Sequence, residues 1–319
     1  MWTYISRRLL QAVVILFIIT FVCFLLTHFS ADPMSQYANK QGMTAADRAA
    51  IYHNLGLDQP LPVQYVKWLW LALHGNLGDS FFSRQPVLTL IRQRLPLTLI
   101  LMSTAEVFII IISLILGTVS AIKQYSALDN IITSFSFIGY SMPIFFIAFG
   151  LMQIFAVQFK AWGLPFLPTG ADIWNPKDIG ALARHMVLPV TCLVIIQVAG
   201  YSRFLRSSIL EVLGLDYIRT ARAKGLSERT MLFKHALRNA ALPFITIIGL
   251  DIPFLLGGAL VTESIFAWPG MGRLFWEYAQ RGDFPVVNGV LLLTGSAVVF
   301  FTIVVDVLYT FVDPRIRLS

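Results

Sequence analysis

Charged side chains are scarce in this chain of 319 residues: Asp, Glu, Lys and Arg together make up 13% of it, whereas 57% is hydrophobic. Soluble domains usually carry about 25% charged residues, so this composition excludes an ordinary soluble protein and favours a single bundle that crosses a membrane repeatedly. Cysteine is equally scarce. Cys23 and Cys192 both lie in apolar runs, which favours small buried hydrophobic side chains over a disulfide or a metal pair.

The motifs of common catalytic sites are also missing. The sequence has no GxxxxGK[ST] phosphate loop, no HExxH and no GxSxG, and each of these would place a nucleotide, a metal or a nucleophile. Its five histidines are scattered without metal-ligand spacing, and no basic face alternates with stacking aromatics as in nucleic-acid binders. We therefore expect the chain itself to be no enzyme and to hold no metal or other cofactor.

Long apolar runs are the main feature that is present. A hydrocarbon core of about 30 Å needs about 20 mostly apolar residues in a helix. Six runs qualify, which predicts an all-α polytopic membrane bundle of six transmembrane helices. The runs are about Leu9–Phe29, Leu97–Ile122, Ile131–Phe159, Met186–Gly200, Leu242–Ile265 and Gly289–Val312.

Two of these runs have unusual lengths. The third contains Gly139, Pro143 and Gly150, which predicts a tilted or kinked helix. The fourth is short, and we expect it to continue into water as YSRFLRSSILEVL until Gly214 ends it.

The first run follows Arg7 and Arg8, as the apolar part of a signal peptide would, but its length favours an uncleaved membrane helix.

The expected organisation has four parts. Residues 1–30 form an N-terminal transmembrane helix, residues 31–95 an extracytoplasmic segment with short helices, residues 96–312 the core membrane domain and residues 313–319 a C-terminal tail. In the second part, Thr44 and Asp47 resemble a capping box of a helix that ends near Gly56. Pro62 is placed to begin another helix, whose tryptophans suit a membrane boundary.

A basic loop at residues 203–241 interrupts the core. It carries eight of the 24 Lys and Arg residues, which no bilayer core would accept. Because Lys and Arg in short loops favour the cytoplasmic side, we expect this loop and both termini to be cytoplasmic. The eight are Arg203, Arg206, Arg219, Arg222, Lys224, Arg229, Lys234 and Arg238.

Within this loop the residues predict two helices. Asp216 can cap a helix of about Tyr217 to Lys224 that Gly225 ends. Ser227 can cap a second helix, which must end or bend before Pro243. Small residues beside Ile218, with charges around them, suit docking into the groove of a partner protein. A solvated basic loop that touches anionic lipid is the alternative, and the residues alone do not separate the two.

This stretch resembles the cytoplasmic loop of permease subunits in ABC importers, specifically the dipeptide/oligopeptide/nickel subfamily. The general family motif is Glu-Ala-Ala, three residues, Gly, nine residues, Ile-x-Leu-Pro. Here Arg219-Thr220-Ala221 precedes Gly225, and Leu242-Pro243 follows. Arg219 replaces the usual Glu and Pro243 comes about five residues late, and both departures are typical of the peptide subfamily.

Further motifs extend the resemblance over nearly the whole chain and in the same order as in the subfamily. They are LGLDQPLPVQYVKWL (Leu55–Leu69), GNLGDSF (Gly75–Phe81), RLPLTL (Arg94–Leu99), FAWPGMGRLF (Phe266–Phe275), DFPVVNG (Asp283–Gly289) and DPRIR (Asp313–Arg317).

The resemblance implies a type I ABC importer permease fold in a bacterial or archaeal inner membrane. It implies a homologous second permease, two ATPase subunits that use ATP and Mg, and an extracytoplasmic solute-binding protein. Transport of peptides by alternating access is expected, with nickel or another small solute as the alternative. The coupling helix that docks on an ATPase would comprise Asp216, Tyr217, Ile218, Arg219, Thr220, Ala221, Arg222, Lys224, Gly225 and Leu226.

Acidic residues inside the predicted spans raise a competing possibility. Each costs roughly 2.5–3.5 kcal/mol at the bilayer centre on insertion scales, so each should face water or a partner. Asp251, close to Pro253 and Gly257, is a candidate for lining the translocation path, and Glu106 is a second. The alternative for Asp251 is a hydrogen bond inside the bundle or protonation. In a proton-coupled secondary transporter such acids would act as relays, but that class predicts inverted repeats, which the two halves lack.

Overall fold

The computed structural model describes residues 2–30, 44, 46, 50, 53, 58–170, 178–256 and 260–312. In these residues the chain forms helices and turns, with one isolated β-bridge between Asp79 and Pro86. The expected Thr44–Gly56 helix lies largely outside the described residues. The helices are α1 (Trp2–Ser30), α3 (Leu61–Leu73), α4 (Val87–Ile122), α5 (Ala127–Ser141), α6 (Ile144–Met152), α7 (Phe159–Ala161), α8 (Ile179–Leu213), α9 (Asp216–Ala223), α10 (Glu228–Thr230), α11 (Leu237–Leu256), α12 (Leu260–Ile265), α13 (Met271–Gln280) and α14 (Phe284–Val312), with π-helical segments at Gln153–Gln158 and Met231–Ala236.

The all-α membrane bundle is confirmed. Among the described residues, five helical stretches are long and apolar enough to cross a membrane. The expected fifth span corresponds to α11 and α12, separated by residues 257–259, so the count of six stays a prediction. The five stretches are Ser6–Leu26, Val87–Ile122, Ile144–Ala161, Ile179–Leu213 and Phe284–Val305.

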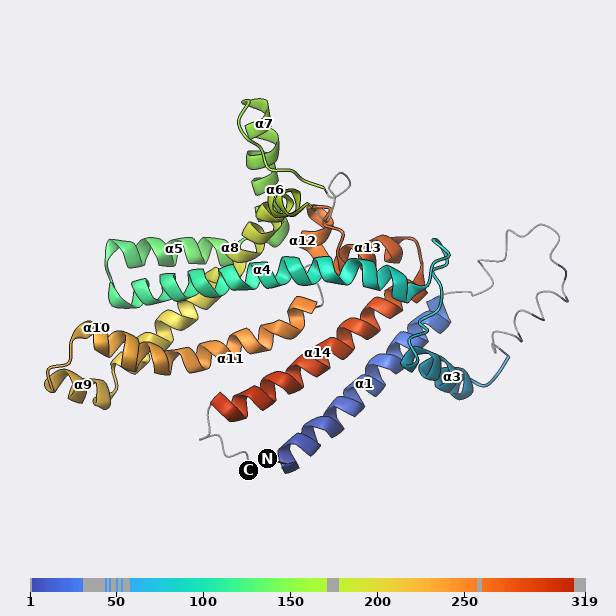
Figure 1. The fold of residues 1–319 in the computed structure, drawn as a ribbon, viewed down its shortest axis with the longest axis horizontal. Coiled ribbons are helices and arrows are strands. Elements are labelled where there is room, and N and C mark those ends of the chain that lie inside the picture. The colour runs from blue at the N-terminus through green and yellow to red at the C-terminus, as the bar shows by residue number, and fades with distance from the viewer. Residues whose placement is uncertain are drawn as a thin grey trace.

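Figure 1 shows the long helices running between two ends of the bundle. One end carries α9 and α10, and the other carries α13; we call them the α9 end and the α13 end. Helices α1 and α14 lie side by side (Figure 1), so that the start of α1 and the end of α14 are near each other. The two helices that begin and finish the described chain therefore pack together.

The third predicted span is interrupted where proline was expected to disturb it. Helix α5 ends at Ser141, and Pro143, which has no N–H to donate, precedes α6. Gly139 lets α5 approach α8 closely, because a Cβ at this position would lie 3.2 Å from the Ile195 carbonyl oxygen. The kink of this segment is confirmed as a break between two helices.

The fourth predicted span continues as one long helix, as expected. Helix α8 extends to Leu213 and ends at Gly214. Its contact with α4 is the most extensive between any two described elements. At Gly117 of α4 a Cβ would lie 2.8 Å from the Ser202 carbonyl oxygen, so only glycine allows this separation of the two backbones.

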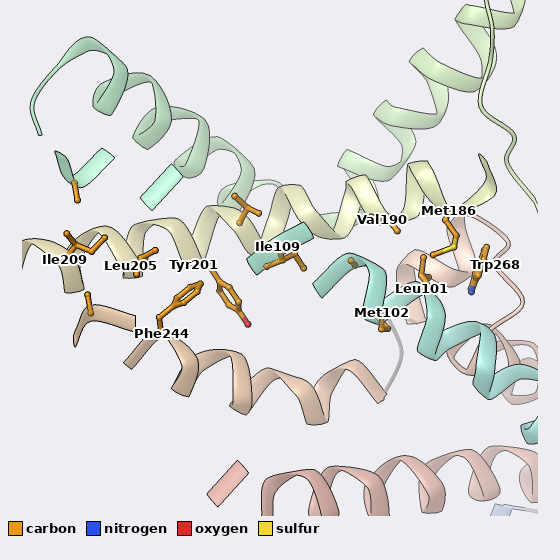
Figure 2. Packing of buried hydrophobic residues seen from close by; sticks show 14 residues of the cluster. Leu101, Met102, Ile109, Met186, Val190, Tyr201, Leu205, Ile209, Phe244 and Trp268 are labelled. Atoms are coloured by element: carbon orange, nitrogen blue, oxygen red, sulfur yellow. The ribbon is translucent and has the colours of Figure 1, made fainter. Parts of the chain in front are cut away.

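The main apolar core fills the space between α4, α8 and α11 (Figure 2). Tyr201 of α8 and Phe244 of α11 meet edge to face, with ring centroids 5.6 Å apart. At the other end of the cluster, the Trp268 indole N–H donates to the Leu97 carbonyl oxygen over 3.1 Å. The core therefore joins three long helices and reaches the residues before α13.

The second loop helix was expected to end or bend before Pro243. It does not end there, because α11 continues through Pro243 to Leu256. A π-helical turn at Met231–Ala236 precedes α11. Neighbouring helices can satisfy the backbone carbonyl that a proline leaves free inside a membrane bundle, so proline need not end the helix there.

Candidate functional site

The predicted coupling helix is present as α9. It begins at Asp216 with Leu215 at its N-cap, and no side chain caps it. The expectation that Asp216 caps the helix was therefore wrong: Asp216 is the first helical residue. Its carboxylate instead lies 3.5 Å from Arg219 Nη1. Both side chains are largely exposed, so water screens the interaction between them.

Gly225 ends α9 as predicted. Its φ is +80°, in the left-handed region that glycine adopts without a steric penalty. The Leu226 N–H donates to the Ala221 carbonyl, and the Gly225 N–H donates to that of Arg222. This pair of bonds is a Schellman motif, which satisfies the last carbonyls of the helix.

The inner face of α9 is fastened to the chain that follows it. Ile218 is fully buried, as is Met231 in the π-helical turn that α9 packs against. The Asn239 side-chain amide donates to the Tyr217 hydroxyl over 2.8 Å. Ile218 was predicted to belong to the coupling helix, and within this chain its buried side chain anchors α9.

Helix α9 and its flanking residues carry both exposed apolar side chains and exposed cations. Arg219, Arg222 and Lys224 are exposed. Exposed large apolar groups next to a basic rim are typical of a surface that a partner protein covers. The apolar members of this α9 surface are Leu215, Tyr217, Leu226 and Phe233.

The second helix of the loop starts where the sequence predicted. The Ser227 hydroxyl accepts from the Thr230 N–H, which caps α10. Arg222 pairs with Glu228 through two contacts of 3.0 and 3.4 Å, both side chains being mostly exposed. This pair links the end of α9 to the start of α10.

Two of the eight basic residues are partly buried against neighbouring helices. The Arg203 guanidinium lies 4.8 Å from the centroids of both the Phe137 and Tyr140 rings. Arg206 donates to both oxygens of Asp129, each over 2.9 Å. These two charges hold α8 to α5 and are not part of the exposed basic surface.

Asp129, the partner of Arg206, is the centre of a hydrogen-bonded cluster. Its carboxylate also accepts from the Ser120 hydroxyl and from the Tyr125 N–H. Arg206 above all, and then the Ser120 and Tyr125 donors, hold the pKa of Asp129 well below its usual range, against the opposing effect of burial. The carboxylate therefore stays ionised at neutral pH and joins the ends of α4, α5 and α8.

Of the four candidates for the translocation path, only Glu106 has a side chain within the described residues. Glu106 lies on α4 and is buried within the bundle. Asp251 and Pro253 lie on α11, and their side chains are outside the described set, as is the whole of Gly257. The path therefore stays a prediction.

Glu263, which the sequence places near the end of the fifth run, lies at the centre of the α13 end. Its carboxylate accepts from the Thr98 hydroxyl over 2.8 Å and from the Gly272 and Arg273 N–H groups over 2.7 and 3.2 Å. The negative charge therefore lies at the N-terminus of α13, where free amide donors point outward. The cluster around Glu263 joins α4, α12 and α13.

The glycines of FAWPGMGRLF are explained by this carboxylate. A Cβ at Gly270 would lie 2.3 to 2.5 Å from the Glu263 carboxyl atoms, and one at Gly272 would lie 2.6 Å from the Leu260 Cα. The motifs GNLGDSF and DFPVVNG meet at the same end, where Asp283 accepts from the Ser80 hydroxyl and the Phe82 N–H.

Sequence reasoning missed the roles of Asp129 and Thr98. Ser126 lies three residues before Asp129, and its hydroxyl accepts the Asp129 N–H. That Ser-x-x-Asp pattern could have located the start of α5. No local signal identifies Arg206 as the partner, because 77 residues separate the two.

Comparisons with known proteins agree with this architecture. Residues 109–318 match the family model described as binding-protein-dependent transport system inner membrane component. Residues 1–102 match the model of the N-terminal region of the same membrane components. Together the two models cover almost the whole chain.

Relatives of full length point the same way. The chain is 41% identical to the oligopeptide transport system permease protein AppB of Bacillus subtilis, covering 99% of this chain and 100% of the relative. It is 38% identical to the dipeptide transport system permease protein DppB of Escherichia coli K12, with 99% of each covered. It is 37% identical to the glutathione transport system permease protein GsiC of Salmonella paratyphi A, again with 99% of each covered. The chain belongs to the binding-protein-dependent inner-membrane component family and is a permease subunit of an ABC importer, not an enzyme.

Proposed function

We propose that this permease forms half of a path for peptides and that α9 is the point at which ATP-driven motion enters the chain. Two ATPase subunits, which hold ATP and Mg, bind at the α9 end, a homologous permease supplies the other half, and a solute-binding protein delivers the solute at the α13 end. Both termini and the α9 end are then cytoplasmic. Peptides are favoured over nickel because AppB and DppB are named for oligopeptide and dipeptide transport.

The observation that carries this proposal is the α9 surface. A short helix with exposed apolar groups and a basic rim is costly in water, because each exposed Å² of apolar surface forfeits about 25 cal/mol of burial free energy. A partner that covers Leu215, Tyr217 and Leu226, and that presents acidic groups to Arg219 and Arg222, would recover that free energy.

The connections of α9 explain how a push on it would reach the bundle. Only Gly214 and Leu215 separate α9 from α8, and α9 packs against the turn that leads into α11. Helix α8 is tied to α4 and α5 by Arg206 and Asp129. We infer that displacement of α9 moves these helices as rigid elements and changes the side from which the path is open.

The path itself is proposed to contain Asp251, with Pro253 and Gly257 on the same segment, and Glu106 of α4. An acid that faces the path would contact the amino group of a peptide. Because Glu106 is buried within the chain, it would have to become accessible in another conformation to take part.

A substitution at Gly225 tests the docking role. The site has open space around a Cβ, so Gly225→Trp would project a large ring toward the partner without clashing inside the chain. We expect membrane insertion to persist, whereas binding-protein-stimulated ATP hydrolysis and solute uptake by the reconstituted importer fall at least about tenfold, equivalent to about 1.4 kcal/mol.

Gly225→Ala is the matched control, because its small side chain carries the same backbone strain at a positive φ as tryptophan does. It should retain most uptake. Normal uptake by Gly225→Trp would refute docking at this site. The solute class is tested separately: purification of the importer with its binding protein, followed by mass spectrometry of the bound solute, should release peptides, and a nickel complex in their place would refute the peptide assignment.

A further inference from the structure

Helix α3 packs against the flank of α1 and not beyond its end (Figure 1). The Tyr65 ring lies 5.9, 5.5 and 5.5 Å from the ring centroids of Phe17, Phe21 and Phe24. The Tyr65 and Thr20 hydroxyl oxygens are 2.9 Å apart and share a hydrogen bond. One face of α3 is therefore fixed to a defined level of α1.

That level lies inside the membrane-spanning part of α1. The apolar stretch ends at Leu26, six residues after Thr20, so a rise of 1.5 Å per residue places Thr20 about 9 Å inward from its end. The whole stretch of 21 residues is about as long as the hydrocarbon core is thick. Tyr65 consequently lies at hydrocarbon depth.

The opposite face of α3 is apolar, and its side chains are exposed in the part of the chain that the structure describes. Val63, Val66, Trp70 and Leu73 recur at helical spacing, and 39%, 62%, 63% and 74% of their surfaces are exposed. On α1, Ile18 lies two residues before Thr20 and is 54% exposed. Both helices thus present apolar surface at the same depth.

The charges of α3 fit this position. Lys67 is the one charged residue in its sequence, LPVQYVKWLWLAL, and it is exposed. A lysine stem can lie along apolar surface while its ammonium group reaches the headgroups. Trp70 suits the boundary region of a bilayer.

We propose that α3 is embedded in the membrane leaflet at the α13 end, with Val66, Trp70 and Leu73 against lipid acyl chains. In the orientation proposed above this is the outer leaflet. The segment 31–95 is then not wholly extracytoplasmic: α3 anchors its second half in the bilayer and leads the chain from α1 to α4. The inference is independent of which solute the importer carries.

Spin labels test this placement directly. Single cysteines replace Val66 and Leu73 in a chain whose buried Cys23 and Cys192 are changed to alanine, within the complete importer in phosphatidylcholine–phosphatidylethanolamine liposomes. Ile18→Cys is the lipid reference and Gln280→Cys, exposed on α13, is the water reference. The measurement is the accessibility of each nitroxide to O₂, which concentrates in acyl chains, and to a water-soluble nickel chelate.

At Val66 and Leu73 we expect the ratio of O₂ to nickel accessibility to match that at Ile18 and to exceed that at Gln280 severalfold. High nickel accessibility would place the face in water and overturn the proposal. Low accessibility to both reagents would mean that protein, such as the second permease, covers the face, and would overturn it equally. The importer with the cysteine-free chain should take up solute as fast as the unmodified importer does. This control verifies that removal of the two cysteines leaves the starting structure intact.

Discussion

Helix α4 is tied to the bundle by a buried carboxylate at two levels, at Thr98 and at Ser120 near its C-terminal end, but by different chemistry. At the α13 end, Glu263 accepts from a threonine hydroxyl and two backbone amides. At the α9 end, Asp129 accepts from a serine hydroxyl, one backbone amide and both arms of a guanidinium group. One cluster relies on oriented neutral dipoles and the other on a formal ion pair.

The difference predicts which kind of substitution destabilises each of the two clusters. The donors around Glu263 come mostly from the backbone, so side-chain exchange cannot remove them, but any added atom disturbs their tight enclosure. The donors around Asp129 include a cation that is left uncompensated if the carboxylate is neutralised. The first junction should therefore be sensitive to volume and the second to charge.

Removal of the charge at Asp129 should have the largest effect. In Asp129→Asn, an NH₂ group replaces an oxygen that accepts from Arg206, so two donors face each other. We expect a loss of unfolding free energy on the order of 3 kcal/mol, measured as a lower thermal midpoint of the purified importer. Glu228→Gln breaks the exposed pair with Arg222 and should cost less than about 1 kcal/mol. Equal midpoints for the two variants would contradict the ion-pair account.

An added methyl group at Gly270 should come next. The Cβ of Gly270→Ala would overlap the Glu263 carboxylate, and we expect a cost of about 2 kcal/mol from overpacking, read from the same thermal midpoint. Gly150→Ala is the control, because a Cβ there has no neighbour within 4 Å. Combined with Glu263→Ala, Gly270→Ala should cost much less than it does alone. Additive effects would show that Glu263 is not what excludes the methyl group.

Neutralisation of Glu263 should have the smallest effect of the three. The Oε of Glu263→Gln can still accept from the Gly272 and Arg273 N–H groups, while its NH₂ can donate to the Thr98 hydroxyl. We expect a loss of about 1 kcal/mol, typical of one weakened hydrogen bond. The test compares the thermal midpoint of this variant with that of Asp129→Asn. A larger loss at Glu263 than at Asp129 would reverse the proposed contrast between the two ends.

Local signals in the sequence predicted several elements correctly. Gly214 and Gly225 end helices where expected, Ser227 caps α10 and Pro62 lies in the first turn of α3. Each depends on the backbone conformation or hydrogen bonding of a few neighbouring residues, which is why short motifs suffice. The apolar runs likewise predicted the helical class, because the length of a span follows from bilayer thickness.

Other outcomes depend on distant residues that compete with a local rule. Pro243 lies within α11, and Asp216 has no capping bond. The burial of Ile218 likewise depends on the packing of α9 on the following turn. None of these outcomes can be read from adjacent residues, because each depends on which helix packs beside which.

The sequence by itself determined that this protein is a helical membrane bundle with one basic loop, because hydrophobic length, scarce charge and turn residues act locally. Only the tertiary structure decided that Arg206 meets Asp129, that Thr98 meets Glu263 and that α3 lies at the flank of α1. Such contacts join residues far apart in the chain, and the free energy of burying a polar group depends on the partners that the fold brings to it.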